Sequence, residues 1–241
     1  MASLTTRHPP HFLRWLLAAT LATIGACGAP DTPSSPGVCR VPTPPAPLSS
    51  PEEVVPCPTA AELDVLDSEI AVSFENGTDQ GDLVCRALDG SRDLTEFQKD
   101  VYQALVLMKS MTFDAPLPWT HRSLYDWFQL DVAGVRIRAG LPNDFCCEPS
   151  RVINLRAVNA PEADRWSYLA MMVHEARHID GFRHSCGGRD NTIDELGSFG
   201  AQYYLMVWIG SHWPAATEAQ RAYTLNRAAW LRVTAFCQEC L

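Results

Sequence analysis

The chain has 241 residues, in which 19 Lys and Arg residues face 28 Asp and Glu residues, for a formal net charge of −9. This acidic balance argues against nucleic acid and anionic lipid headgroups as partners, because both attract basic surfaces. It carries no information about a particular substrate. Residues 59–241 are long enough to form one domain with a sizeable core.

The first 26 residues have the pattern of a signal peptide. Arg7 and Arg14 supply a basic region, and the apolar run 12–24 is too short to span a membrane. Small residues then precede Cys27, which resembles the cleavage and lipidation site of bacterial lipoproteins. We therefore expect a signal peptide over 1–26 and a lipid on Cys27, with an ordinary signal peptide as the alternative. Both interpretations export the chain, and the first anchors it to the membrane on the periplasmic or extracellular face of a bacterial envelope.

Cysteine usage agrees with export. If Cys27 carries a lipid, eight of the nine cysteines remain, an even number for a chain outside the reducing cytosol. We expect all eight to form disulfides, although the sequence does not give the pairing. Cys237-x-x-Cys240 fits a redox or zinc motif as well, but without a second such pair disulfide bonding is favoured. The eight are Cys39, Cys57, Cys85, Cys146, Cys147, Cys186, Cys237 and Cys240.

Proline-rich sequence separates the leader from the domain. Residues 27–58 hold the lipidation cysteine and a linker that is too rich in proline to form a packed core. Residues 59–241 form the predicted domain. Apolar periodicity and turn signals predict the following elements in it: helices over 93–111 and 120–130, strands over 132–139 and 151–158, and helices over 161–180, 192–208 and 215–236. This order predicts an α+β fold, in which a small mixed sheet packs on the helix 161–180 and further helices follow.

The helix 161–180 carries a pattern with metal-ligand spacing, H-E-x-x-H-x-x-G-x-x-H. His174 and His178 are four residues apart, so they lie on one helix face and can aim two imidazole nitrogens at one ion about 2 Å away. Glu175 can reach water at that ion as a general base without being a ligand. Gly181 can adopt a positive φ, which ends the helix and lets His184 return as a third ligand.

Two acidic residues are alternatives for the third position. Glu195 opens the predicted helix 192–208, although Thr192-x-x-Glu195 is also a capping-box pattern. Asp180 is more plausible as an outer-shell partner that hydrogen-bonds a ligand imidazole. Small residues after Glu195 would let its helix pack closely against the motif helix: Gly197, Ser198, Gly200 and Ala201.

The pattern resembles that of the zincin metallopeptidases, and its longer form is similar to that of the metzincin branch. The resemblance implies that His174, His178 and His184 bind Zn²⁺ and that Glu175 is the catalytic base; in the gluzincin branch, Glu195 would be the third ligand. Metzincins also place a methionine in a turn below the metal, whereas Met206, the only downstream methionine, lies in sequence that predicts a buried helix. The resemblance further implies that the strand 151–158 is the edge that pairs with an extended substrate.

The resulting hypothesis is a zinc-dependent peptidase that acts on a peptide or protein substrate. Zinc with three protein ligands keeps one position for water, as in catalytic sites. Four residues are available to stabilise an oxyanion: Arg183, Tyr203, Tyr204 and His212. The alternatives are a non-catalytic metal-binding lipoprotein of the cell envelope and a metallohydrolase of a non-peptide amide.

Overall fold

A computed structural model of the chain describes residues 56–75, 83–85, 92–141, 150–157 and 164–238. The predictions for the leader 1–26, the lipid on Cys27 and the linker up to residue 55 lie outside these residues. So do those for Cys39, Cys146, Cys147 and Cys240. The described part is a mixed fold of α-helices and two small sheets, which agrees with the α+β prediction.

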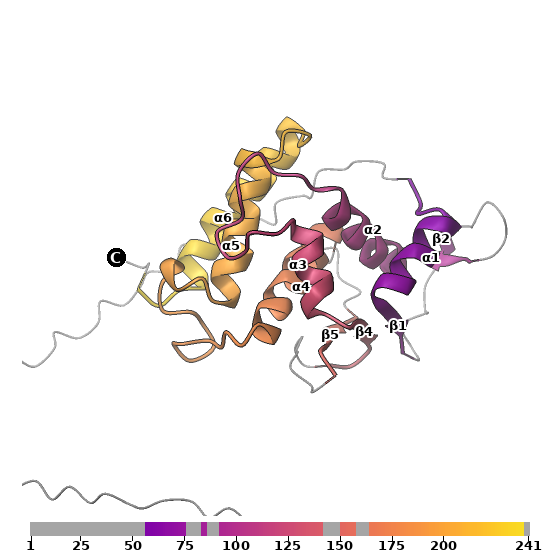
Figure 1. Cartoon of the computed structure of the whole chain (residues 1–241), viewed down its shortest axis with the longest axis horizontal. Coiled ribbons are helices and arrows are strands. Elements are labelled where there is room, and N and C mark those ends of the chain that lie inside the picture. Colours follow the sequence, from indigo (N-terminus) through magenta and orange to yellow (C-terminus); the bar gives the residue numbers. More distant parts are fainter. Residues whose placement is uncertain (1–55, 76–82, 86–91, 142–149, 158–163, 239–241) are drawn as a thin grey trace, which may run out of the picture. The chain divides into compact units, whose positions relative to one another are not determined.

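Six α-helices, one 3-10 turn and five short strands occur among the described residues (Figure 1). In chain order they are α1 Ala60–Glu69, β1 Ala71–Phe74, β2 Leu83–Cys85, β3 Leu94–Thr95, α2 Glu96–Ser110, α3 Leu124–Asp131, β4 Gly134–Arg138, β5 Val152–Arg156, α4 Arg165–Ile179, η1 Ile193–Glu195, α5 Ser198–His212 and α6 Glu218–Thr234. The helices predicted over 93–111, 120–130 and 215–236 and both predicted strands are confirmed as α2, α3, α6, β4 and β5. Sequence reasoning did not predict α1, β1, β2 and β3.

Side-chain caps explain where most helices begin. Thr59, Thr95 and Thr217 each form a capping box, in which the threonine hydroxyl and a Glu or Gln three residues later satisfy each other's backbone N–H groups. The motif helix α4 begins at Arg165 because the carboxylate of Asp164 accepts from the N–H of Ser167 at 2.8 Å.

The strands form two sheets and not the single mixed sheet that the sequence predicted. In one sheet β1, β4 and β5 run parallel in the order β1-β4-β5, and the other is the antiparallel pair β2-β3. Parallel neighbours need long crossover connections. The chain from β1 to β4 includes α2 and α3, and residues 139–151 join β4 to β5. The strand β5 lies at one edge of its sheet, directly before the motif helix in the sequence.

The helix α4 packs against α2, α5 and β5, so it lies in the middle of the domain's core. The inner face that its periodicity predicted is confirmed, since every member is buried: Trp166, Leu169, Met172, Val173 and Ala176. In turn, α5 packs along α6, as Figure 1 shows in its orange-to-yellow helices. The site-bearing end of α4 is therefore held by a large apolar core.

The helix predicted over 192–208 is interrupted, and this prediction was wrong in its first part. Leu196 adopts a left-handed φ of 50°, which separates the short turn η1 from α5. The Nε of Arg177 on α4 donates to the carbonyl oxygen of Leu196 at 2.8 Å and so stabilises the break. Met206 lies buried inside α5, as its sequence predicted, and not in a turn.

Two disulfides join distant parts of the described chain, Cys57–Cys85 and Cys186–Cys237. Cys237 pairs with the distant Cys186 and not with Cys240. It therefore forms a disulfide, which the sequence favoured over a redox or zinc motif. Disulfides indicate an oxidising compartment.

Across the described residues, each helix is too short or too polar to cross a membrane.

Candidate metal centre

Three histidines converge at the C-terminal end of α4. One ligand atom from each of His174, His178 and His184 lies within 4.8 Å of the other two, and the ring centroids are 4.7 to 5.2 Å apart. Ligand atoms around a single tetrahedral zinc ion are separated by roughly 3 to 3.5 Å. The three imidazoles are therefore close enough to share one ion after a small contraction.

Gly181 makes the convergence possible. The helix ends at Ile179, and Gly181 has a φ of 95°, a left-handed value that a side chain would strain. Its N–H donates to the carbonyl oxygen of His178 at 3.0 Å, and the N–H of Phe182 donates to that of Arg177 at 3.3 Å. This is a glycine-terminated helix end. The chain reverses there, as the sequence predicted, and returns His184 to the helix face.

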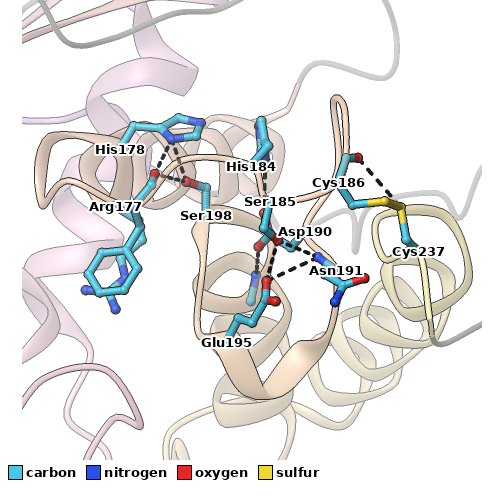
Figure 2. A network of polar contacts seen from close by, with 12 residues as sticks. Arg177, His178, His184, Ser185, Cys186, Asp190, Asn191, Glu195, Ser198 and Cys237 are labelled. Carbon is cyan, nitrogen blue, oxygen red and sulfur yellow. Dashed lines mark hydrogen bonds and ion pairs between the residues drawn. A yellow bond between two sulfur atoms is a disulfide. The ribbon is translucent and has the colours of Figure 1, made fainter. Parts of the chain in front are cut away.

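Hydrogen bonds select the tautomer of His178. Its Nδ1 lies 2.6 Å from the carbonyl oxygen of Phe182 and 2.8 Å from the Oγ of Ser198 (Figure 2). A carbonyl oxygen can only accept, so Nδ1 carries the proton and donates. The hydroxyl of Ser198 in turn donates to the same carbonyl oxygen at 3.3 Å. The Nε2 of His178 therefore keeps its lone pair, which is what a metal ligand requires.

His184 is held in the same tautomer by a carboxylate. Its Nδ1 lies 2.9 Å from the Oδ1 of Asp190, which is buried. A carboxylate accepts this proton, so the Nε2 of His184 also offers a lone pair. Partners of this kind orient metal-bound histidines and raise their basicity. Asp190 was not identified from the sequence, because it lies six residues beyond His184 in a loop without periodicity.

The imidazoles on α4 are suited to bind a cation because their lowered pKa values favour the neutral form. Burial, together with the neighbouring His178 and His184, lowers the pKa of His174 to about 3. Burial also lowers the pKa of His178, against the opposing hydrogen bond to Phe182. A neutral imidazole is the form that binds a metal, and zinc, copper, iron and nickel all accept it. The Nδ1 of His174 has no hydrogen-bond partner among the described residues.

Glu175 follows His174 on α4, and its side chain is also buried, with 4% of its surface exposed. Because it is buried and directly follows a candidate ligand on the motif helix, Glu175 is the candidate for proton transfer at the site. Phe199, the second residue of α5, closes one side of the cluster. Its ring packs against His174 and His184 at centroid distances of 4.4 and 4.9 Å.

The alternative third ligand, Glu195, takes a different position. Its carboxylate accepts from the hydroxyl of Ser185 and from the N–H of Asn191, so it braces the loop from within (Figure 2). Thr192 makes no side-chain cap, and the capping-box interpretation of Glu195 is therefore wrong as well. The structure brings His184, and not Glu195, to the two helix histidines.

Asp180 does not support a ligand imidazole, contrary to the expectation. Its Oδ2 accepts from Nη1 of Arg177 at 2.8 Å and from Nε1 of Trp127 at 3.1 Å. These contacts tie the end of α4 to α3.

The four oxyanion candidates are placed unequally. His212 lies at the far end of α5 and bonds to Asp114 at 2.8 Å, about 20 Å along the helix from Phe199. Tyr204 packs toward Trp208 on the same helix. Tyr203 is one helical turn from Phe199, and the charge of Arg183 acts on His178, so these two remain candidates.

The helix α5 packs against α4, as the small residues at its start predicted, and two of these residues also contact the site. Ser198 is buried against His178, and Gly197 leaves space for the carboxylate of Asp190.

Comparisons of the chain with protein-family models, with curated proteins and with solved structures find no match. The interpretation of the centre consequently depends on its own residues and geometry.

Proposed function

We propose that the chain is a zinc-dependent peptidase that is anchored outside the cytoplasmic membrane. The observation that carries the proposal is the convergence of three imidazoles, two from α4 and one from the loop after Gly181. The buried Glu175, which follows His174 on α4, supports it. Three protein ligands leave a position for water, which favours a catalytic over a structural ion. The resemblance of the motif to that of the zincins supports zinc and peptide hydrolysis.

Each residue has a distinct part in the proposed reaction. His174, His178 and His184 would hold the ion, and zinc, when bound, would supply the Lewis acidity that lowers the pKa of water to about 7. Glu175 accepts a proton from the attacking water on its carboxylate and passes it to the leaving amine. Tyr203 or Arg183 stabilises the oxyanion.

The change Glu175→Gln tests this assignment. It removes the base while keeping the size of the side chain, so zinc should stay bound while peptide hydrolysis falls by about 10² to 10⁴-fold. The exposed Glu218→Gln on α6 is a matched control and should leave both properties unchanged. Metal content should be measured for the wild-type chain and both variants. The same three proteins should be screened for cleavage of a broad set of peptides and non-peptide amides.

The outcomes of that screen separate the candidate functions. Hydrolysis that survives Glu175→Gln contradicts the role of Glu175. Stoichiometric zinc without cleavage of any substrate would instead support the metal-binding lipoprotein, and cleavage confined to non-peptide amides would support the other hydrolase.

We further propose that Cys27 carries the lipid that anchors the chain. The disulfides Cys57–Cys85 and Cys186–Cys237 support export, since such bonds persist in oxidising compartments. Cys27→Ser should block lipid attachment and leave an unprocessed precursor or a soluble exported form. Unchanged membrane association and unchanged N-terminal mass would contradict the anchor.

A further inference from the structure

The carboxylate of Asp190 is the point at which the loop of the third histidine is held. Only 1% of Asp190 is exposed, and two hydrogen-bond donors converge on it. Nδ1 of His184 lies 2.9 Å from Oδ1, and the backbone N–H of Gly200 on α5 donates to Oδ2 at 3.0 Å. One oxygen thus faces the candidate ligand, while the other is fixed to a helix of the core.

The backbone around this carboxylate leaves it little room to move. A Cβ at position 197 would lie 2.5 Å from Oδ2 of Asp190, so glycine is needed there for the carboxylate to fit. Residue 197 directly precedes α5. The first turn of α5 and the carboxylate therefore fit together closely.

The main chain of Asp190 is attached to the end of α6. Its N–H donates to the carbonyl oxygen of Ala235 at 3.2 Å, and its carbonyl oxygen accepts from the N–H of Cys237 at 3.0 Å. The disulfide Cys186–Cys237 binds the same loop to the same place (Figure 2). Asp190 is thus fixed to α5 by its side chain and to α6 by its backbone, and its position does not depend on the loop alone.

The chemistry of this contact requires a carboxylate. An ionised carboxylate has two acceptor oxygens and no donor, so it can satisfy both His184 and Gly200. An asparagine has the same shape but only one acceptor oxygen, because an NH₂ group replaces the second oxygen. This NH₂ donor would face another donor, which is either the imidazole N–H of His184 or the backbone N–H of Gly200. A buried donor left without an acceptor costs about 1 to 3 kcal/mol.

We propose that Asp190 is the positioning residue of the third metal ligand. Its carboxylate holds the Nδ1 proton of His184, which leaves Nε2 free and aimed at the ion, and thereby sets the affinity of the centre. This inference rests on the proposed metal centre but not on peptide hydrolysis. Asp190 itself does not touch the ion or the substrate.

Zinc affinity of the oxidised full-length chain tests the proposal, measured by competition with a chelator. Asp190→Asn should weaken zinc binding by about 10 to 100-fold, as is usual for the loss of an outer-shell partner. In a His184→Ala background the same change should have less than about a twofold effect, because Asp190 acts through His184. Equal losses in both backgrounds, or no loss in the first, would overturn the proposal.

A second measurement needs no variant and therefore does not depend on the folding of Asp190→Asn. Imidazole ¹⁵N chemical shifts of the metal-free wild-type chain should show His184 protonated on Nδ1, and protonation on Nε2 alone would overturn the proposal. The two hypotheses fail separately. Zinc binding without hydrolysis would contradict the peptidase but not Asp190, whereas the wrong tautomer would contradict Asp190 but not the peptidase.

Discussion

The two halves of the metal centre are built in different ways. On α4, His174 and His178 are placed by helical periodicity, and the helix is fixed by a buried apolar face. In the loop between α4 and α5, His184 is placed by contacts of individual side chains and by a disulfide. Helical periodicity sets the positions of the first pair, while tertiary contacts set the position of the third ligand.

The difference shows where the centre is sensitive to change. A ligand on α4 keeps its position as long as the core is folded, because backbone hydrogen bonds fix the helix. The loop has little regular structure between Gly181 and η1, so its order depends on Asp190, on Glu195 and on Cys186. Conditions that leave the fold intact can therefore still disturb the third ligand.

The largest expected effect is the loss of a helix ligand. His178→Ala should weaken zinc binding on the order of 1,000-fold, if a binding free energy of about 10 to 16 kcal/mol is shared among the ligands. His184→Ala should leave a weaker but measurable site, because the two helix histidines stay preorganised. Chelator competition measures the zinc affinity of the two variants. Tighter zinc binding by His178→Ala than by His184→Ala would contradict the proposed difference between helix and loop ligands.

The two disulfides offer a matched test of the loop. Replacing both members of either pair by serine should lower the free energy of unfolding by about 4 kcal/mol, because both close loops of similar entropy, with sequence separations of 28 and 51. Only the Cys186/Cys237 replacement should also weaken zinc binding, by roughly tenfold, since ordering one or two loop residues costs 1 to 2 kcal/mol each. An equal loss of affinity from the Cys57/Cys85 replacement would show that the effect is global.

The pH dependence of metal binding should distinguish the buried helix ligands from ordinary histidines. Three unperturbed imidazoles, each with a pKa of about 6.5, would release up to three protons per ion when the metal binds at lower pH. The pKa of His174 is lowered to about 3, so this residue has no proton to release at pH 5.5, and burial lowers the pKa of His178 in the same direction. At pH 5.5 we therefore expect fewer than three protons per ion, measured by calorimetry in buffers of different ionisation enthalpy. Release of three protons would contradict the lowered values.

Ser198→Ala should have the smallest effect. His178 keeps its hydrogen bond to the carbonyl oxygen of Phe182 at 2.6 Å, so its tautomer does not depend on the serine. Loss of one neutral hydrogen bond typically costs about 1 kcal/mol. Zinc affinity should fall by no more than a few fold, well short of the effect of Asp190→Asn. A loss as large as that of Asp190→Asn would mean that α5 controls both halves of the centre.

The helical half of the site could be predicted because its signals are local. The apolar face from Trp166 to Ala176, the spacing of His174 and His178 and the glycine at 181 all act within a few residues. The expectation that His184 returns to the helix followed from that glycine and from the spacing of His184 in the motif. The short distances among the three histidines agree with it.

The remaining features depend on contacts between residues far apart in the sequence. The helix predicted over 192–208 is broken at Leu196, whose left-handed backbone is stabilised by Arg177 of α4. Asp190 has its function only because α5 and the end of α6 meet it in space. The division of the strands into two sheets similarly follows from long crossovers that no local pattern reports.

The metal content of the oxidised full-length chain tests the central claim most directly. Purified protein loaded with zinc and then dialysed should retain one ion per chain, and His174→Ala/His178→Ala should retain none. Absence of zinc from the wild-type chain, or full occupancy of the double variant, would contradict a metal centre formed by these histidines.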